Sequence, residues 1–189
     1  MHVTSLDIPG LLVFEPRRHA DERGFVSEVW RADVFRAHAG DVDLVQDNHA
    51  YSSRRGTLRG LHFQKPPMAQ GKLVRAVRGS ILDVAVDIRH GSPTFGRHVA
   101  VELSAENWRQ LWVPAGFLHG FVTLADETEI VYKMSSHYSP ADSGGVVFDD
   151  PDLGIDWTLP AERITLSDRD RVLPRLRDLP PLFAYDGQG

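Results

Sequence analysis

An all-β fold, in the form of a sandwich or barrel of short strands, is the fold class that this sequence of 189 residues predicts. Many segments alternate apolar and polar residues with a period of two, which is typical of strands that bury one face. Turn-forming Gly, Pro and Asp residues separate these segments at short intervals, and helix-like patterns are scarce. Many short strands at regular spacing predict a β-sandwich or barrel, and the jelly roll is one such fold.

The clearest strand predictions lie in the middle of the chain. In residues 80–88 one face carries Leu82, Val84, Val86 and Ile88, and the other face carries Asp83 and Asp87. We therefore expect a half-buried strand with the apolar face inward. Residues 98–103 alternate in the same way, with Val99, Val101 and Leu103 inward. The other predicted strands are 11–16, 24–30, 44–51, 57–63, 72–77, 109–114, 117–124 and 127–135.

The ends of the chain are less regular. Residues 31–39 form the best helix candidate, which Gly40 ends. From about residue 140 the chain is rich in Pro and Asp, and we expect it to wrap around the body with a few short helices. A length of 189 residues fits one domain spanning 1–189, with the N-terminal strands and the C-terminal tail packed as extensions.

Composition narrows the class of protein. Hydrophobic residues make up 42% and charged residues 25%, which suits a globular chain with a buried core. The formal charge of -5, without any basic run, argues against a nucleic-acid partner. No apolar stretch approaches the roughly 18 residues that span a bilayer, and the N-terminal residues do not resemble a signal peptide. We therefore expect no membrane association and a cytoplasmic location. The lack of cysteine excludes disulfides and thiolate nucleophiles.

The segment Pro114-Ala-Gly116-Phe-Leu-His119 resembles the second half of the cupin signature, P-x-G-x-x-H. In metal-binding cupins the first half supplies two histidines and a glutamate. Here the corresponding segment, residues 58–64, supplies only His62. A stable first-row metal site normally needs three or more N/O ligands, so the sequence predicts neither a metal nor a cofactor.

A second resemblance is more specific and runs from about Leu6 to Asp170. It rests on motifs that occur in order along the chain: Gln46-Asp-Asn-His49, Thr57-Leu-Arg59-Gly-Leu-His62-Phe-Gln64, Gly71-Lys72-Leu-Val-Arg75, Asp83-Val-Ala-Val-Asp87-Ile-Arg89, Gly91-Ser-Pro-Thr-Phe-Gly96, Val113-Pro-Ala-Gly-Phe-Leu-His119-Gly-Phe121, Tyr132-Lys133, Tyr138-Ser-Pro140, Asp149-Asp-Pro151 and Leu166-Ser-Asp-Arg-Asp170. Together they resemble the dTDP-4-dehydrorhamnose 3,5-epimerase family. The resemblance implies a cupin jelly roll with a few short peripheral helices, and a dTDP-linked 4-keto-6-deoxy sugar as the substrate.

The implied chemistry suits the residues of these motifs. A 4-keto sugar has acidic hydrogens on carbons 3 and 5, because loss of either gives an enolate. Inversion needs a base on one face, an acid on the other and a donor at the oxyanion. His62 fits the base, because imidazole titrates near neutrality and a buried carboxylate would fix its tautomer. The resemblance makes Asp170 that partner. A hydrogen-bonded interior histidine is the alternative for His62.

Tyr132 fits the acid, since its phenol stays protonated at neutral pH and its predicted strand face, with Thr128, Ile130 and Met134, suits a barrel interior. Lys72 fits the oxyanion stabiliser, as a point charge. His119 is expected to assist in the same pocket. A core tyrosine and a surface lysine are the structural alternatives.

The resemblance also implies a nucleotide site. The expected ligands of the diphosphate are arginines, whose planar fork binds phosphate oxygens in pairs, and the base and sugar are expected to meet polar and aromatic side chains. These residues are Arg23, Arg59, Glu28, Gln46, Asp47, Asn48 and Tyr138. Each is also compatible with an ordinary surface position.

Three local features qualify this interpretation. Ser143 stands where the family usually has an acidic residue, and Arg169 stands where it usually has Lys. Both positions lie at the substrate rim, so these departures leave the identity of the sugar or the nucleotide open. Arg59 and His62 are three residues apart, so a regular strand would point them to opposite faces. If both serve one pocket, the strand must bulge, and Gly60 is best suited to allow it.

The sequence thus predicts a homodimeric epimerase that inverts carbons 3 and 5 of a dTDP-4-keto-6-deoxyhexose. A relative that inverts only one of these carbons remains open. So do a sugar-nucleotide-binding cupin without catalysis and a metal-dependent cupin oxygenase.

Overall fold

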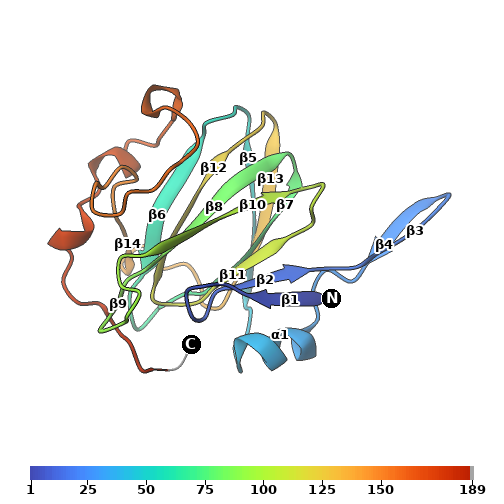
Figure 1. Cartoon of the computed structure of the whole chain (residues 1–189), viewed down its shortest axis with the longest axis horizontal. Helices are drawn as coiled ribbons and strands as arrows, with labels where there is room; N and C mark the ends of the chain where they lie inside the picture. Colours follow the sequence, from blue (N-terminus) through green and yellow to red (C-terminus); the bar gives the residue numbers. More distant parts are fainter. Residues whose placement is uncertain (188–189) are drawn as a thin grey trace.

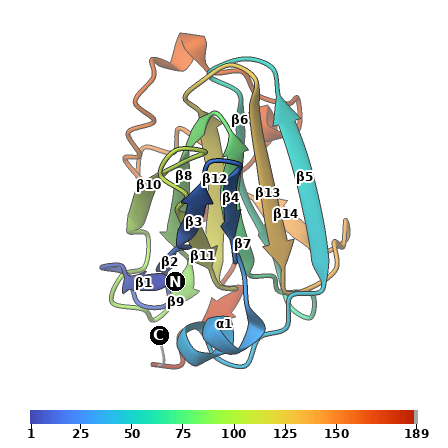
Figure 2. The same ribbon diagram turned by 90° about the vertical axis from the view of Figure 1, so that its right-hand side faces the viewer.

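The computed structural model describes residues 1–187 and consists of two facing antiparallel sheets with peripheral extensions (Figures 1 and 2). Its elements in chain order are β1 His2–Ser5, β2 Leu12–Glu15, β3 Arg18–Asp21, β4 Gly24–Ser27, α1 Ala32–Ala39, β5 Gln46–Ser52, β6 Leu58–Gln64, β7 Lys72–Arg78, β8 Ser80–Asp87, β9 Arg89–His90, β10 His98–Ser104, β11 Gln110–Val113, β12 Phe117–Thr123, β13 Thr128–Met134, β14 Ser143–Gly145, the 3-10 helices η1 Ala161–Arg163, η2 Asp170–Val172 and η3 Leu176–Asp178, and β15 Phe183–Ala184. The predicted all-β class is confirmed.

Most strands that follow each other along the chain lie in different sheets, so the neighbours within each sheet are mostly not consecutive in sequence. One sheet has six strands in the order β1-β2-β11-β7-β13-β5, and the other has five in the order β10-β8-β12-β6-β14. β3 and β4 form a separate hairpin that projects from the body in Figure 1. No helix among residues 1–187 is long and apolar enough to cross a bilayer.

Three apolar clusters hold the layers together. The space between the sheets is filled from both sides, for example by Leu111 and Ile130 of the first sheet and Ala85 and Phe121 of the second. The outer face of the six-stranded sheet is covered by α1, whose Phe35 packs on Trp112 with ring centroids 4.9 Å apart. The outer face of the five-stranded sheet is covered by the C-terminal segment, including Trp157.

The C-terminal segment on the five-stranded sheet changes which face of residues 80–88 points outward, and so corrects the prediction for that strand. Leu82, Val84, Val86 and Ile88 do not face the space between the sheets but pack outward, under the C-terminal segment. Asp83 and Asp87 therefore lie on the inner face of β8 and are fully buried. The expectation of a half-buried strand with a polar outer face is wrong, because a third layer covers the face that would otherwise meet water.

Most other sequence predictions hold within one or two residues. The helix α1 spans Ala32–Ala39 and ends at Gly40, whose φ of 84° is a conformation that glycine adopts easily. Val99, Val101 and Leu103 of β10 face inward as expected. The strand predicted at 24–30 stops at Ser27, and the short strands β1, β3, β9, β14 and β15 were not predicted.

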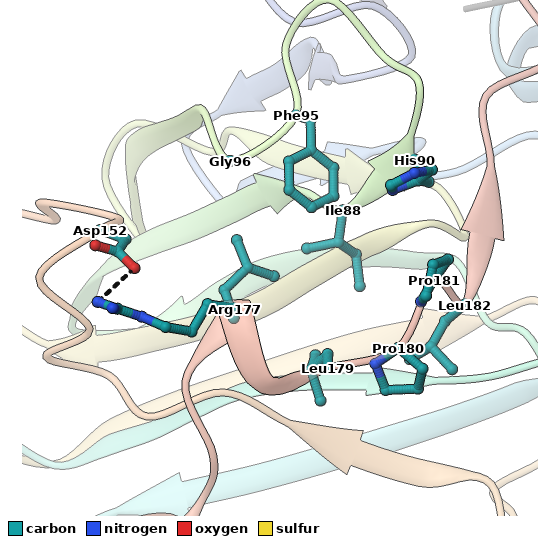
Figure 3. Close-up of a pocket in the computed structure, with 11 residues that line it drawn as sticks. Ile88, His90, Phe95, Gly96, Asp152, Arg177, Leu179, Pro180, Pro181 and Leu182 are labelled. Carbon is teal, nitrogen blue, oxygen red and sulfur yellow. Dashed lines mark ion pairs between the residues drawn. The ribbon is translucent and has the colours of Figure 1, made fainter.

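The C-terminal segment contains the expected short helices, and it leaves an apolar hollow of about 430 Å³ against the five-stranded sheet (Figure 3). Ile88, Phe95 and Leu179 contribute apolar walls to it. At one end Arg177 forms an ion pair with Asp152 at 2.9 Å. Because the lining is mainly apolar and Asp152 is already paired with Arg177, this hollow is a poor candidate for a reaction site.

Candidate active site

A second cavity, of about 460 Å³, has the opposite character. It opens between the two sheets, and the segment around residues 165–170 closes one side. Seven residues predicted from the sequence line it: Arg59, His62, Lys72, His119, Tyr132, Arg169 and Asp170. The fold thus gathers acids, bases and cations from β6, β7, β12, β13 and the C-terminal segment around one space.

A bulge in β6 lets Arg59 and His62 serve the same cavity. His119 of β12 pairs with His62, but Phe121 pairs with Arg59, so the register shifts between them. Gly60 lies in this shift with a φ of 131°. A Cβ atom at Gly60 would lie 2.5 Å from the Cα of Gly120, so only glycine fits there. The bulge predicted from the sequence is confirmed.

His62 is bound to Asp170 by a hydrogen bond of 2.6 Å between Nε2 and Oδ1. The side chain of Asp170 is 5% exposed, whereas that of His62 is 31% exposed towards the cavity. Burial acts to raise the pKa of Asp170, but the hydrogen bond and charge of His62 outweigh it and keep that pKa below its usual value. Because a carboxylate only accepts, Nε2 carries the proton and Nδ1 of a neutral His62 keeps its lone pair.

Tyr132 lies on the inner face of β13, on the side of the strand that buries Thr128, Ile130 and Met134, as predicted. Its hydroxyl oxygen accepts a hydrogen bond of 3.0 Å from Nδ2 of Asn48. The hydroxyl proton is therefore left for another acceptor. Asn48 is in turn fixed by Gln46, whose Nε2 donates to its Oδ1 at 2.9 Å.

Lys72, at the start of β7, brings a cation to the cavity wall. Loss of water around its ammonium lowers its pKa to about 8, and the charge of Asp83 opposes this effect. His119 lies beside it on the lining and donates from Nε2 to Oδ1 of Asp83 at 2.8 Å. A desolvated ammonium next to a cavity is suited to meet a developing negative charge.

Other predicted residues form the rim. Arg169 donates to the hydroxyl of Ser143 at 2.9 Å, so the two departures from the family pattern contact each other. Gln46 accepts from the backbone N–H of Tyr138 at 3.0 Å, and the Tyr138 side chain stays exposed. Arg59 donates to the carbonyl of Tyr51 at 3.1 Å.

Seven predicted residues are absent from the lining. Four of them connect to it through hydrogen bonds, namely Gln46, Asn48, Tyr138 and Ser143, whereas in the described part of the chain the other three do not. Asp47 alternates with Asn48 along β5, so it faces outward and pairs with Lys133 at 2.9 Å. Arg23 sits at the tip of the β3–β4 hairpin and pairs with Asp21 at 2.6 Å. Glu28 follows the hairpin and lies 3.5 Å from Arg31.

Sequence reasoning missed several residues of the site. Phe121, Ile130, Thr165 and Ser167 also line the cavity. Asp83 lies behind it, bound to His119. Asp83 was visible within its motif, but the alternation of residues 80–88 placed it on a polar outer face. Asp83 and Asp87 alternate with Ile81 and Ala85 on one face of this segment. The two apolar residues on that face were the available signal that it points inward.

The arrangement provides a base, an acid and a cation around one cavity. Among residues 1–187, no three His, Asp or Glu side chains gather as they would around a metal ion. A jelly roll that encloses a His–Asp pair, a tyrosine and a lysine around one cavity is suited to a cupin-type isomerase that works by proton transfer.

The particular family follows from comparison with known proteins. Residues 5–178 match the family model described as dTDP-4-dehydrorhamnose 3,5-epimerase. A protein of that name from Sinorhizobium fredii is 50% identical over 98% of this chain and 94% of its own. This chain belongs to the dTDP-4-dehydrorhamnose 3,5-epimerase family, and it is an epimerase.

Solved structures agree with this assignment. The 3,5-epimerase of Legionella pneumophila, in complex with dTDP-4-keto-L-rhamnose, superposes with a TM-score of 0.92, is 41% identical and covers 98% of this chain and 100% of its own. A double mutant of a 3'-monoepimerase from Streptomyces bikiniensis, bound to dTDP, gives a TM-score of 0.89 at 41% identity, over 99% of this chain and 94% of its own.

Proposed function

We propose that this chain inverts carbons 3 and 5 of a dTDP-linked 4-keto-6-deoxyhexose, with His62 as the base and Tyr132 as the acid. The observation that supports this most directly is the 2.6 Å pair of His62 and Asp170 in a cavity that Tyr132 and Lys72 also line. The family supplies the type of reaction, and the geometry supplies the residues proposed to carry it.

In the proposed mechanism, Nδ1 of His62 takes the proton from a carbon beside the ketone. The C–H electron pair becomes the enolate, whose negative charge moves to the ketone oxygen near the Lys72 ammonium. Tyr132 then donates its hydroxyl proton to the opposite face of that carbon, and the enolate returns to the ketone. Asp170 stabilises the imidazolium formed in the first step. Solvent takes the proton from His62 and restores the proton of Tyr132 before the second carbon reacts.

The nucleotide is proposed to bind at the open side of the cavity. Arg59 and Arg169 supply cations there for a diphosphate, and Tyr138 presents an exposed ring beside Gln46 for the base. Ser143 contacts Arg169 and lies at the same rim. Asp47 points to the opposite face of β5, so it could contact the substrate only from outside this cavity.

A homodimer would account for the three residues that this chain keeps away from its own cavity. The β3–β4 hairpin is extended away from the body and exposes Phe25 by 54% and Val26 by 76%. β5 is an edge strand of its sheet, and unpaired edges favour association. We therefore place Arg23 and Glu28 in the pocket of a neighbouring copy. Light scattering that finds a fully active monomer at micromolar concentration would contradict this.

The roles of His62 and Tyr132 can be separated by deuterium exchange. The substrate, dTDP-4-keto-6-deoxyglucose, is incubated in heavy water, and deuterium and product are located by NMR. His62→Ala should lose both exchange and inversion by about a hundredfold or more, because it removes the base. Tyr132→Phe should keep exchange, since His62 returns a deuteron to the same face, but should lose inversion.

Two results would contradict these roles. Equal loss of exchange and inversion in Tyr132→Phe would place the tyrosine at an earlier step, and full inversion would make another group the acid. Asn48→Ala serves as a matched control, because it removes the hydrogen bond to the tyrosine but leaves the hydroxyl.

Inversion of a single carbon is the second candidate. It is favoured by the 3'-monoepimerase structure, which is as identical to this chain, at 41%, as the 3,5-epimerase structure is. The same NMR experiment decides between them through the configuration of the deuterated product: inversion at both carbons supports the double inversion, and inversion at one carbon supports the single inversion. No exchange at all would favour a binding protein without catalysis.

A further inference from the structure

A second His–Asp pair lies beneath the cavity, and the proposed proton transfers do not use it. Asp83 of β8 is fully buried, and the only hydrogen bond to its carboxylate within the described chain comes from His119 to Oδ1, at 2.8 Å. Its Oδ2 atom is buried without any partner among residues 1–187. His119 is itself 7% exposed and forms part of the cavity lining.

A buried carboxylate oxygen without a partner is expensive, because burial removes the water that would hydrate its charge. Such a group persists when a nearby positive charge offsets part of that penalty. Lys72 is that charge: Asp83 acts on it across space and raises its pKa, against the larger lowering caused by burial. The two residues come from different sheets, and His119, which holds Asp83 at 2.8 Å, lines the same cavity as Lys72.

We propose that Asp83 is a positioning residue of the epimerase: its buried carboxylate, held in place by His119, keeps the Lys72 ammonium charged and directed at the ketone oxygen of the sugar. His119 has the supporting task, since its Nε2–H fixes Oδ1 and leaves Oδ2 free. The proposal rests on the oxyanion role proposed for Lys72.

The surroundings of Lys72 explain why its ammonium needs a nearby negative charge. The titratable groups that line the cavity with Lys72 are Arg59, His62, His119, Tyr132, Arg169 and Asp170, and Asp83 lies behind His119. Arg59 and Arg169 are cations and disfavour a further positive charge, and Asp170 is occupied by His62. With a pKa of about 8, Lys72 loses its proton just above neutral pH. Removal of the Asp83 charge would lower the pKa of Lys72 further, so that at neutral pH more of the enzyme would meet the enolate without its cation.

The test is the pH profile of kcat/KM for Asp83→Asn, a substitution that keeps the shape and removes the charge. At about pH 6.5 the variant should stay within about threefold of the unmodified protein. At about pH 8.5 it should fall by about eightfold, because the alkaline limb moves about one pH unit lower. Lys72→Arg, which stays charged, should lack this limb altogether, and so shows that the limb belongs to Lys72.

A second measurement does not depend on catalysis. The rate at which an amine-reactive anhydride labels Lys72, followed by mass spectrometry against pH, gives the titration of the ammonium. Asp83→Asn should shift that titration down by about one unit, and Asp83→Glu, which restores a carboxylate, should shift it back. Asp87→Asn is the matched control: it removes a buried charge from the same strand but should not move the Lys72 titration.

Each outcome has a clear meaning. An equal loss of kcat/KM at every pH, or an unshifted Lys72 titration, overturns the proposal and leaves Asp83 a structural residue. Absence of epimerase activity in the unmodified protein would instead contradict the proposed function, while the labelling experiment would still decide the role of Asp83. If Asp83→Asn does not fold, Asp83→Ser removes the charge with a smaller side chain and is measured in the same way.

Discussion

Asp83 and Asp87 lie four residues apart on β8, face the same side of the strand and are both fully buried, yet their surroundings are opposite. Asp87 accepts five hydrogen bonds, whereas Asp83 accepts one. Two carboxylates with the same burial can therefore have different tasks. The number of their partners distinguishes them better than their burial does.

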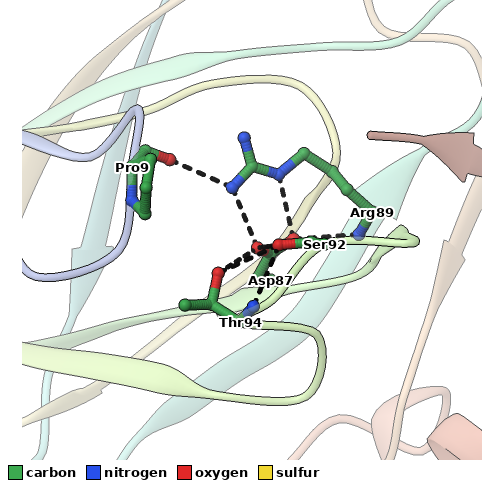
Figure 4. A network of polar contacts seen from close by, with 5 residues as sticks. All are labelled: Pro9, Asp87, Arg89, Ser92 and Thr94. Atoms are coloured by element: carbon green, nitrogen blue, oxygen red, sulfur yellow. Dashed lines mark hydrogen bonds and ion pairs between the residues drawn. The ribbon is translucent and has the colours of Figure 1, made fainter. Parts of the chain in front are cut away.

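Asp87 is saturated (Figure 4). Arg89 contacts it through the backbone N–H and two guanidinium nitrogens, and the hydroxyls of Ser92 and Thr94 donate to Oδ2 at 2.6 and 2.7 Å. Arg89 also donates to the carbonyl of Pro9 at 3.0 Å, so the network joins the β8–β10 connection to the N-terminal segment. A carboxylate with every lone pair occupied has no capacity left for a substrate, and we interpret it as structural.

Asp83 is left incomplete and lies behind the reactive cavity. A buried group that lacks partners stores an unfavourable energy that the fold tolerates only where something else depends on it. In this molecule the dependent group is Lys72. The saturated carboxylate of Asp87 thus serves the structure, and the incomplete carboxylate of Asp83 serves the proposed reaction.

The largest effect on stability is expected for Asp87→Asn. The substitution leaves the buried guanidinium of Arg89 without its counter-ion, and the loss of one partner of a buried ion pair typically costs about 3 to 5 kcal/mol. For a chain of this size the melting temperature should fall by about 6 °C or more, measured by circular dichroism. Epimerase activity per folded molecule at 25 °C should not change.

Thr94→Val provides a graded control for that variant. It removes one of the five hydrogen bonds and keeps the volume, so the expected loss is about 1 kcal/mol, or about 2 to 4 °C. A loss from Asp87→Asn no greater than that from Thr94→Val would show that the network is not the saturated structural element described above.

A smaller effect is expected in the dependence of stability on pH. Burial acts to raise the pKa of Asp87, but the bonds from Arg89, Ser92 and Thr94 outweigh it and keep that pKa below its usual value. The stabilisation is therefore complete above the unfolded pKa of about 4 and is lost as the pH falls through the lower folded value. The melting temperatures of the unmodified protein and Asp87→Asn should converge in acid. A constant difference down to about pH 2 would contradict this.

Much of this architecture could be predicted from the sequence because its signals are local. Period-two alternation located most strands, and Gly40 ended α1 where expected. The bulge at Gly60 was predicted because two residues three apart had to reach one space. The grouping of His62, Tyr132, Lys72 and Asp170 came from resemblance to a family, since no spacing along the chain brings these residues together.

The rest depended on information that a single strand does not carry. The C-terminal segment lies more than 50 residues away in the sequence and covers the apolar face of β8. Because that face is covered, the other face, with Asp83 and Asp87, turns inward between the sheets. Alternation shows that two faces differ, but it does not show which of them meets water. Asp47 was grouped with Asn48 by its motif, although alternation alone already placed it on the other face of β5.

The smallest effect on stability is expected for Asp83→Asn, although it makes the same chemical change in the same strand as Asp87→Asn. The amide can still accept the hydrogen bond from His119, so that contact survives. Loss of the carboxylate charge removes the attraction to Lys72, but it also removes the penalty of a buried, unsolvated charge on Oδ2, and the two changes oppose each other. The melting temperature should therefore stay within about 2 to 4 °C of the unmodified protein, which corresponds to about 1 kcal/mol. Thermal unfolding of both variants side by side at neutral pH measures the contrast directly. If Asp83→Asn destabilised the fold as much as Asp87→Asn does, an incomplete set of partners would not distinguish the functional aspartate from the structural one.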